Sequence, residues 1–205
     1  MQGSIGVPTE YTQATMPSAS AVASGTTIYN STYGVRMRSN GTRWVPLGPF
    51  TVDQNTRSDV VTGAIAESLM HSVDVSDAVR YMGPKGRLVI TAGWTLTSNA
   101  NAKNCFIRIG TAAGTAGTQI FGSAATGTSG TVASKTIYAR GSETLQASSA
   151  TASGANGTGG AVVLMSTLNY ATGGSTVVVS FTAAPVGAGD TATLNWYSIF
   201  IEPGF

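Results

Sequence analysis

Charged side chains are scarce in this chain. Asp, Glu, Lys and Arg make up 10% of its 205 residues, against about 25% in an average globular protein. The formal net charge is +2, from 11 Lys and Arg against 9 Asp and Glu. So small and scattered an excess creates no broad basic field. The sequence therefore predicts no nucleic-acid binding and no electrostatic attraction to anionic lipid.

Cysteine and long apolar runs are scarce as well. Cys105 is the single cysteine, which excludes a disulfide within the chain, and its alternation with Ile107 and Ile109 predicts a buried thiol. No stretch approaches the roughly 20 apolar residues of a membrane helix, so no membrane insertion is expected. The start, Met1 to Ile5, has neither a basic beginning nor an apolar run, which predicts no signal peptide and release from the producing cell by lysis.

The single histidine, His71, is followed by Ser72, Asp74 and Asp77. A Ser-His-Asp triad needs its nucleophile on a sharp turn beside oxyanion donors, and the segment HSVDVSD has no G-x-S-x-G. One histidine with two aspartates also falls short of the three or four N or S ligands of a usual zinc site. We expect His71 to end a strand. The sequence predicts no catalytic residue, no metal, no cofactor and no enzymatic activity.

A pair of carboxylates for glycoside hydrolysis stays open as an alternative. Five of the nine acidic residues lie between Asp53 and Asp77, but nothing in their pattern singles out two of them as an acid and its partner.

What the chain does have is apolar alternation between clusters of Gly, Ser, Thr and Asn. The clearest case is residues 87–110, where two alternating segments flank the turn-forming run at residues 98–101. This pattern predicts a β-hairpin in the middle of a sandwich. With this hairpin included, the strands predicted for the sandwich are residues 64–71, 87–97, 103–110, 118–122, 132–140, 143–148, 161–170, 175–183 and 191–202.

The predicted fold is all-β: an antiparallel, jelly-roll-like β-sandwich with a small N-terminal β module and an extended N-terminal arm. The module is indicated by short alternating segments around Asn40-Gly41, the strongest short hairpin-turn dipeptide. Its boundaries divide the chain into an arm at 1–24, a β module at 25–52, a polar connector at 53–63 and the sandwich at 64–205.

The last strand is apolar on both of its faces. A terminal strand of this kind fits the centre of a sheet or an interface between subunits, and an obligate interface resembles a domain core cut in half. The residues predicted to form a subunit interface are Trp196, Ile199, Phe200 and Ile201.

Three segments carry a resemblance to small structural proteins of tailed-bacteriophage virions. They are NGTRWVPLGPF at 40–50, GPKGRLVITAGWTLTSNANAKNCFIRIG at 83–110 and TLNWYSIFIE at 193–202. The resemblance implies a virion protein that forms a homotrimer, with an N-terminal attachment element and a jelly-roll head. The residues expected to attach it to the particle are Tyr29, Arg43, Trp44 and Pro46. No catalytic residue is carried over, because the family pattern supplies none.

Three functions follow as hypotheses. The first is a tail-fibre or receptor-binding protein that docks through its N-terminal region and presents the sandwich to host polysaccharide or protein. The second is a capsid decoration protein, whose partners are capsid subunits rather than a tail adaptor. A polysaccharide depolymerase is the third, and it ranks last because such spikes usually carry a long β-helix that 205 residues cannot hold.

Overall fold

A computed structural model describes residues 8–63, 66–127, 129–144, 146–149, 162–165, 168–170 and 174–205. Within these ranges strands dominate, and the helices are the one-turn α1 (Ser76–Val79) and the 3-10 helix η1 (Ala19–Ala21). The predicted all-β class and the sandwich are thus confirmed. None of the described helices is long and apolar enough to cross a membrane.

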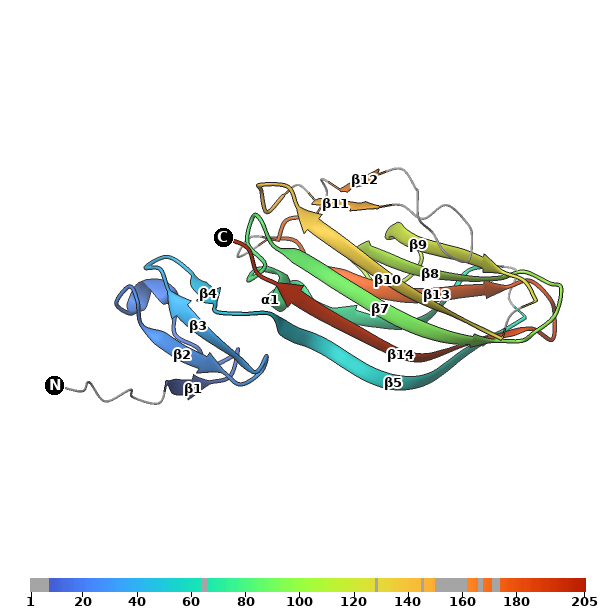
Figure 1. Cartoon of the computed structure of the whole chain (residues 1–205), viewed down its shortest axis with the longest axis horizontal. Coiled ribbons are helices and arrows are strands. Elements are labelled where there is room, and N and C mark those ends of the chain that lie inside the picture. Colours follow the sequence, from blue (N-terminus) through green and yellow to red (C-terminus); the bar gives the residue numbers. More distant parts are fainter. Residues whose placement is uncertain are drawn as a thin grey trace.

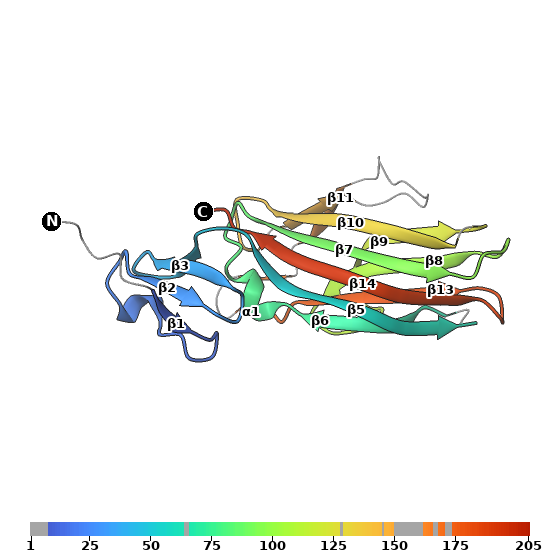
Figure 2. The same cartoon turned by 60° about the horizontal axis from the view of Figure 1, so that its bottom comes forward.

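Two antiparallel sheets form the sandwich (Figure 1). The six-stranded sheet has the order β12-β11-β10-β7-β14-β5, and the four-stranded sheet has the order β6-β13-β8-β9. Figure 2 shows the two layers from another side. The strand bounds are β5 (Phe50–Thr62), β6 (Ser68–Asp74), β7 (Arg87–Leu96), β8 (Lys103–Gly110), β9 (Thr118–Ala125), β10 (Gly130–Ala139), β11 (Gln146–Ser149), β12 (Val162–Met165), β13 (Val178–Pro185) and β14 (Thr191–Glu202).

The pairing is nested, with early strands joined to late ones. β5 pairs with β14, β6 with β13, β7 with β10, and β8 with β9. Except for the β8–β9 hairpin and the β10–β12 meander, consecutive strands therefore lie in opposite sheets. This is the double-sheet arrangement of a jelly roll.

The predicted hairpin at residues 87–110 is wrong in its pairing. Both strands exist, but β7 lies in the six-stranded sheet and β8 in the four-stranded one, so the turn between them crosses the sandwich. Local turn residues indicate that the chain reverses. They cannot indicate whether the next strand pairs or faces its predecessor, because distant partners decide that.

The core lies between the sheets, and its predicted faces are confirmed. Leu88, Ile90 and Trp94 of β7 are at most 3% exposed, and Cys105 and Ile107 of β8 are fully buried. Burying such side chains stabilises a fold by roughly 1.5–3 kcal/mol each. Burial also raises the pKa of the Cys105 thiol to about 12, which leaves it an unreactive apolar group.

The polar connector predicted at residues 53–63 is also wrong, because these residues form most of β5. β5 is an edge strand, hydrogen-bonded to β14 only, and most of its side chains are partly or fully exposed. Such a strand needs few apolar residues, and charged side chains protect its open edge from aggregation. Its polar sequence therefore resembled a linker.

The N-terminal module is a four-stranded sheet of β1 (Thr9–Tyr11), β2 (Thr27–Asn30), β3 (Val35–Ser39) and β4 (Trp44–Pro46), in that order. The extended arm predicted at 1–24 is corrected where it is described, since residues 8–24 fold onto this module. β1 pairs in parallel with β2, and Ala19 is buried with its carbonyl accepting a hydrogen bond from Ser39 Oγ at 2.8 Å. Residues 1–7 lie outside the described part of the chain.

Candidate functional site

A short segment, Gly41 to Trp44, builds the junction between the module and the sandwich, and we term it the GTRW element. Asn40 Oδ1 accepts hydrogen bonds from the backbone N–H groups of Thr42 and Arg43 at 3.0 and 2.8 Å, while Gly41 takes the left-handed conformation at φ +91°. This tight turn points the Arg43 side chain out of the module. Arg43 then forms a bidentate ion pair with Glu143, Nη2 lying 3.2 Å from Oε2.

Other contacts reinforce the junction. Gln13 Nε2 of the module donates to the Tyr81 hydroxyl at 2.8 Å, and the same Gln13 accepts from Asn30 Nδ2 at 3.0 Å. The Tyr33 ring packs on Phe50, with centroids 5.2 Å apart. Burial, and then the charge of the nearby Asp77, raises the pKa of Tyr33 to about 12.

A cleft of about 290 Å³ follows this junction. Two of its lining residues, Arg43 and Arg80, are cationic, but both are neutralised within the chain, Arg43 by Glu143 and Arg80 by Asp77. The Arg43 pair links the module to the sandwich, whereas the Arg80 pair lies within the α1 segment of the sandwich.

The residues predicted for attachment to the particle do not form one exposed surface. Trp44 is 4% exposed, and its indole N–H donates to the carbonyl of Pro17 at 2.7 Å. Pro46 is buried, Tyr29 is half-buried, and Arg43 is engaged by Glu143. Trp44 and Pro46 are therefore structural residues of the module, because their side chains face its interior.

The predicted subunit interface divides between the two faces of β14. Ile199 and Ile201 are fully buried in the sandwich core, so an interface role for them is wrong. Trp196, 37% exposed, and Phe200 lie on the outer face of the six-stranded sheet. Alternation along the strand makes this division, and the register shift between Leu194 and Trp196 decides that Ile199 and Ile201 face inward with Leu194.

The Trp196 indole packs against Gly93 of the neighbouring strand β7. A Cβ atom at position 93 would be 2.4 Å from Trp196 Nε1 and 2.6 Å from Cε2. Only glycine gives the indole this seat. Gly93, Thr131, Val132, Asn195 and Trp196 line an open groove of about 340 Å³, which we term the Trp196 groove.

The histidine site is not the one that its sequence neighbours suggested. His71 lies within β6, and its Nε2 is 3.2 Å from the hydroxyl of Tyr197, which donates to Asp53 Oδ2 at 2.7 Å. Asp74 and Asp77 are occupied elsewhere, by Ser76 and Arg80. Sequence reasoning missed this trio because its members come from β5, β6 and β14.

The electrostatics of the trio favour a structural role. Burial, and secondarily the Arg57 guanidinium, lowers the pKa of His71. Burial and the hydrogen bond to Asp53 raise the pKa of Tyr197, so it remains a neutral donor. In the described ranges no group of three or more His, Cys, Asp and Glu side chains could hold a metal ion.

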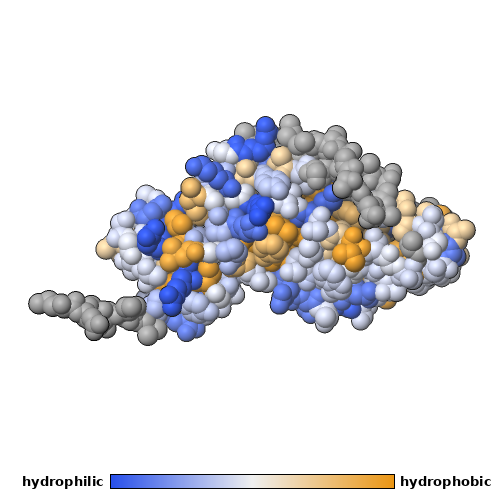
Figure 3. Space-filling view, in the orientation of Figure 1, coloured by the Kyte–Doolittle hydropathy of each residue, from blue (hydrophilic) through white to orange (hydrophobic). Residues whose placement is uncertain are grey.

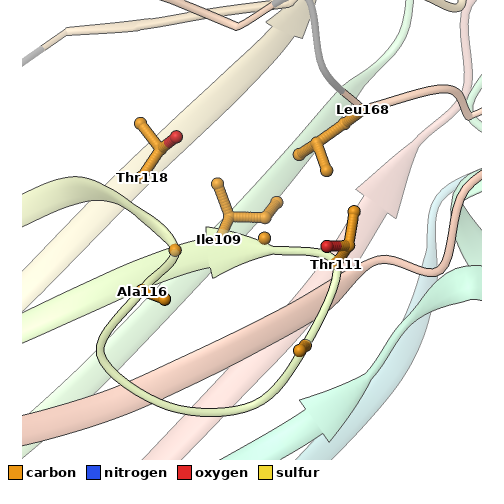
Figure 4. Close-up of a pocket in the computed structure, with 8 residues that line it drawn as sticks. Ile109, Thr111, Ala116, Thr118 and Leu168 are labelled. Atoms are coloured by element: carbon orange, nitrogen blue, oxygen red, sulfur yellow. The ribbon is translucent and has the colours of Figure 1, made fainter.

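A further pocket of about 190 Å³ lies at the turn between β8 and β9. Figure 4 shows Ile109, Leu168 and the two threonines Thr111 and Thr118 around it. Its described lining offers hydroxyl groups and apolar surface, with no ionisable side chain, so it suggests no chemistry.

No known family's sequence pattern matches the chain, and no curated protein is detectably similar to it in sequence. Among solved structures, lectin II from Ulex europaeus is 10% identical, with 78% of this chain and 89% of that one covered and a TM-score of 0.31. The endo-1,3-beta-glucanase from Streptomyces sioyaensis is 12% identical, covers 83% and 77%, and has a TM-score of 0.31. A structure of infectious bursal disease virus, Gx strain, is 11% identical, covers 78% and 42%, and has a TM-score of 0.24. Similarity this weak carries no conclusion about the function of the present chain.

Proposed function

We propose that this chain is a structural subunit of a tailed-bacteriophage virion. In this proposal the N-terminal module docks to the particle, and the jelly roll is the head that meets the host surface. The observation that carries it is the junction: Arg43, in the segment that resembles phage structural proteins, reaches from the module to Glu143 of the head. A docking element joined to a head in this way transmits position and force between particle and host.

The proposal includes self-association into a trimer. Its contact is the groove of about 310 Å³ beside the junction, lined by Tyr33, Gly34, Pro49, Phe50, Thr51 and Phe200, three of which are aromatic. Apolar residues also gather on the outer face of the six-stranded sheet, over the part of β7 and β14 that lies toward the N-terminal module (Figure 3). Exposed apolar surface of this kind suits contact between copies.

The proposed action is binding and positioning, with no catalytic residue assigned. The trio of His71, Tyr197 and Asp53 has no nucleophile on a sharp turn and no oxyanion donors placed beside it. Release of reducing sugars from a host polysaccharide by the purified chain would contradict this part of the proposal.

Copy number in purified particles tests the proposal and separates its two forms. Quantitative gel analysis that finds roughly a dozen to a few dozen copies supports a tail or fibre position, whereas hundreds support capsid decoration. Absence of the chain from particles overturns both forms. For the tail form, saturating purified chain should also block adsorption of the phage to its host, and undiminished adsorption would contradict host attachment.

A further inference from the structure

The outer face of the six-stranded sheet holds one aromatic ring in a position fixed by the backbone. In the register of β10, β7 and β14, Val132 lies opposite Gly93, and Gly93 lies opposite Trp196. The indole occupies the space above Gly93 that any other residue would fill. Because its seat is preformed, a ligand that stacks on this ring loses little affinity to ordering it.

Hydroxyl and amide groups surround the ring. Asn195 Nδ2 donates to Thr95 Oγ1 at 2.5 Å, which fixes the Asn195 amide beside the indole. The residues on this outer face form rows across β10, β7 and β14. Starting near Leu96, where β7 ends, the rows are Gly130, Thr95 and Thr193; Val132, Gly93 and Trp196; Ser134, Thr91 and Ser198; and Thr136, Val89 and Phe200. These rows carry no charged side chain. The ion pair of Arg87 with Glu202 lies at the other end of these strands.

This combination selects one class of ligand. A sugar ring presents C–H groups on its face and hydroxyl groups at its rim, so it matches a flat indole bordered by hydroxyls and an amide. An anionic ligand would find no cation in the rows. A protein partner needs about 800 Å² with a largely apolar centre, whereas the surroundings of Trp196 are mainly threonine and serine.

We propose that the Trp196 groove binds a neutral saccharide by stacking one sugar ring on the indole. The inference rests on the proposed role in host attachment, for which it names the site and the chemical class of the receptor. The Trp196 ring supplies the stacking surface, the Asn195 amide supplies hydrogen bonds, and Gly93 positions the ring.

Tryptophan fluorescence offers a direct readout. Trp44 and Trp94 are 4% and 3% exposed, whereas Trp196 is 37% exposed, so an aqueous quencher such as iodide reports mainly on Trp196. The full-length chain is titrated with neutral oligosaccharides of glucose, galactose, mannose and N-acetylglucosamine, and is applied to an array of neutral bacterial polysaccharides. A ligand in the groove is expected to protect Trp196 from the quencher.

Three variants separate the ring, its position and the surrounding surface. Trp196→Ala removes the ring, and Gly93→Ala keeps the ring but displaces it from its seat; each is expected to weaken saccharide binding at least tenfold. Tyr138→Ala removes another aromatic ring, 49% exposed on the same sheet but outside the groove, and should bind as the parent does. Unchanged binding by Trp196→Ala and Gly93→Ala would overturn the inference.

Two further outcomes count against it. If Trp196 becomes protected as protein concentration rises without saccharide, in step with sedimentation of a larger species, the groove is covered by another copy of the chain. If Trp196 stays accessible and no neutral saccharide of the panel or the array binds, the groove is not a sugar site. In either case the presence of the chain in particles and its competition for adsorption still test the proposed function separately.

Discussion

Two tryptophans show how differently the N-terminal module and the head use the same side chain. Trp44, in the GTRW element, is buried and hydrogen-bonded to Pro17, so it holds the N-terminal module together. Trp196 lies on the outside of the head and rests on Gly93. The GTRW motif, the more distinctive of the two in the sequence, therefore contributes a buried structural residue. The ring that a partner can reach comes from a strand whose sequence resembles core.

The sharpest test of this contrast is Trp44→Ala. Removing a buried tryptophan costs about 3–5 kcal/mol, and here it also leaves the Pro17 carbonyl without its donor. We expect hydrogen exchange to lose protection in β2, β3 and β4 while the sandwich strands keep theirs. Leu47→Ala, at a position 51% exposed, is the matched control and should change little. Equal protection in both variants would remove the structural role of Trp44.

Tyr197→Phe tests the inner side of the same strand that carries Trp196. The lost hydroxyl donates to Asp53 and contacts His71, so the free energy of unfolding should fall by about 1–2 kcal/mol. Denaturant unfolding measures this, with Tyr138→Phe on the outer face as the control. If both variants unfold alike, the trio contributes nothing to stability.

The ion pair at the junction is expected to have a smaller effect. A double-mutant cycle of Arg43→Gln and Glu143→Gln should give a coupling energy of about 1 kcal/mol, the upper end for a partly exposed pair, because the contact is bidentate. Arg57→Gln with Asp59→Gln, a pair within β5, serves as the comparison. Removing this comparison pair should leave hydrogen exchange in the N-terminal module unchanged, because the pair does not contact the module. Zero coupling for Arg43 would mean that other contacts hold the junction.

Trp196→Ala should lower stability least among these side-chain truncations, by less than about 1 kcal/mol, because the ring is on the surface. Thermal unfolding of the variant beside Trp44→Ala gives the comparison in one experiment. A loss as large as that of Trp44→Ala would show that Trp196 belongs to the structural group.

His71 makes stability depend weakly on pH. Because its pKa in the fold lies below the ordinary value of about 6.5, the unfolded chain binds the proton more readily, and stability falls as pH drops below about 6.5. It is the only histidine, so His71→Gln should flatten the dependence of the unfolding midpoint just below that pH. An unchanged slope in the variant would contradict this assignment.

Much of the strand content was predictable, because β7, β8 and β14 bury apolar residues on alternate positions between turn-forming clusters. Their pairing was not, since β5 and β14 meet across more than a hundred residues and no local pattern encodes the partner of an edge strand. The extra residue at Asn195 shifts the alternation of β14. The bulge therefore turns Trp196 outward although Leu194, two residues before it, faces the core, and it places Ile199 and Ile201 inward.

For the candidate sites, too, the sequence indicated single residues but not their partners. Arg43 and Trp44 stood out as a motif, but their roles required the positions of Glu143 and Pro17, which lie far away in sequence. A glycine at position 93, inside an otherwise strand-like segment, was the one local signal of the Trp196 groove, because glycine in a strand often marks a close approach by another group. The trio around His71 left no local signal.

A reconstruction of the virion by electron cryomicroscopy tests the central claim most directly. We expect density for three copies of this chain together, with the N-terminal module against the particle and the opposite end of the jelly roll directed outward. Particles without this density, or with the jelly roll docked and the module directed outward, would contradict it.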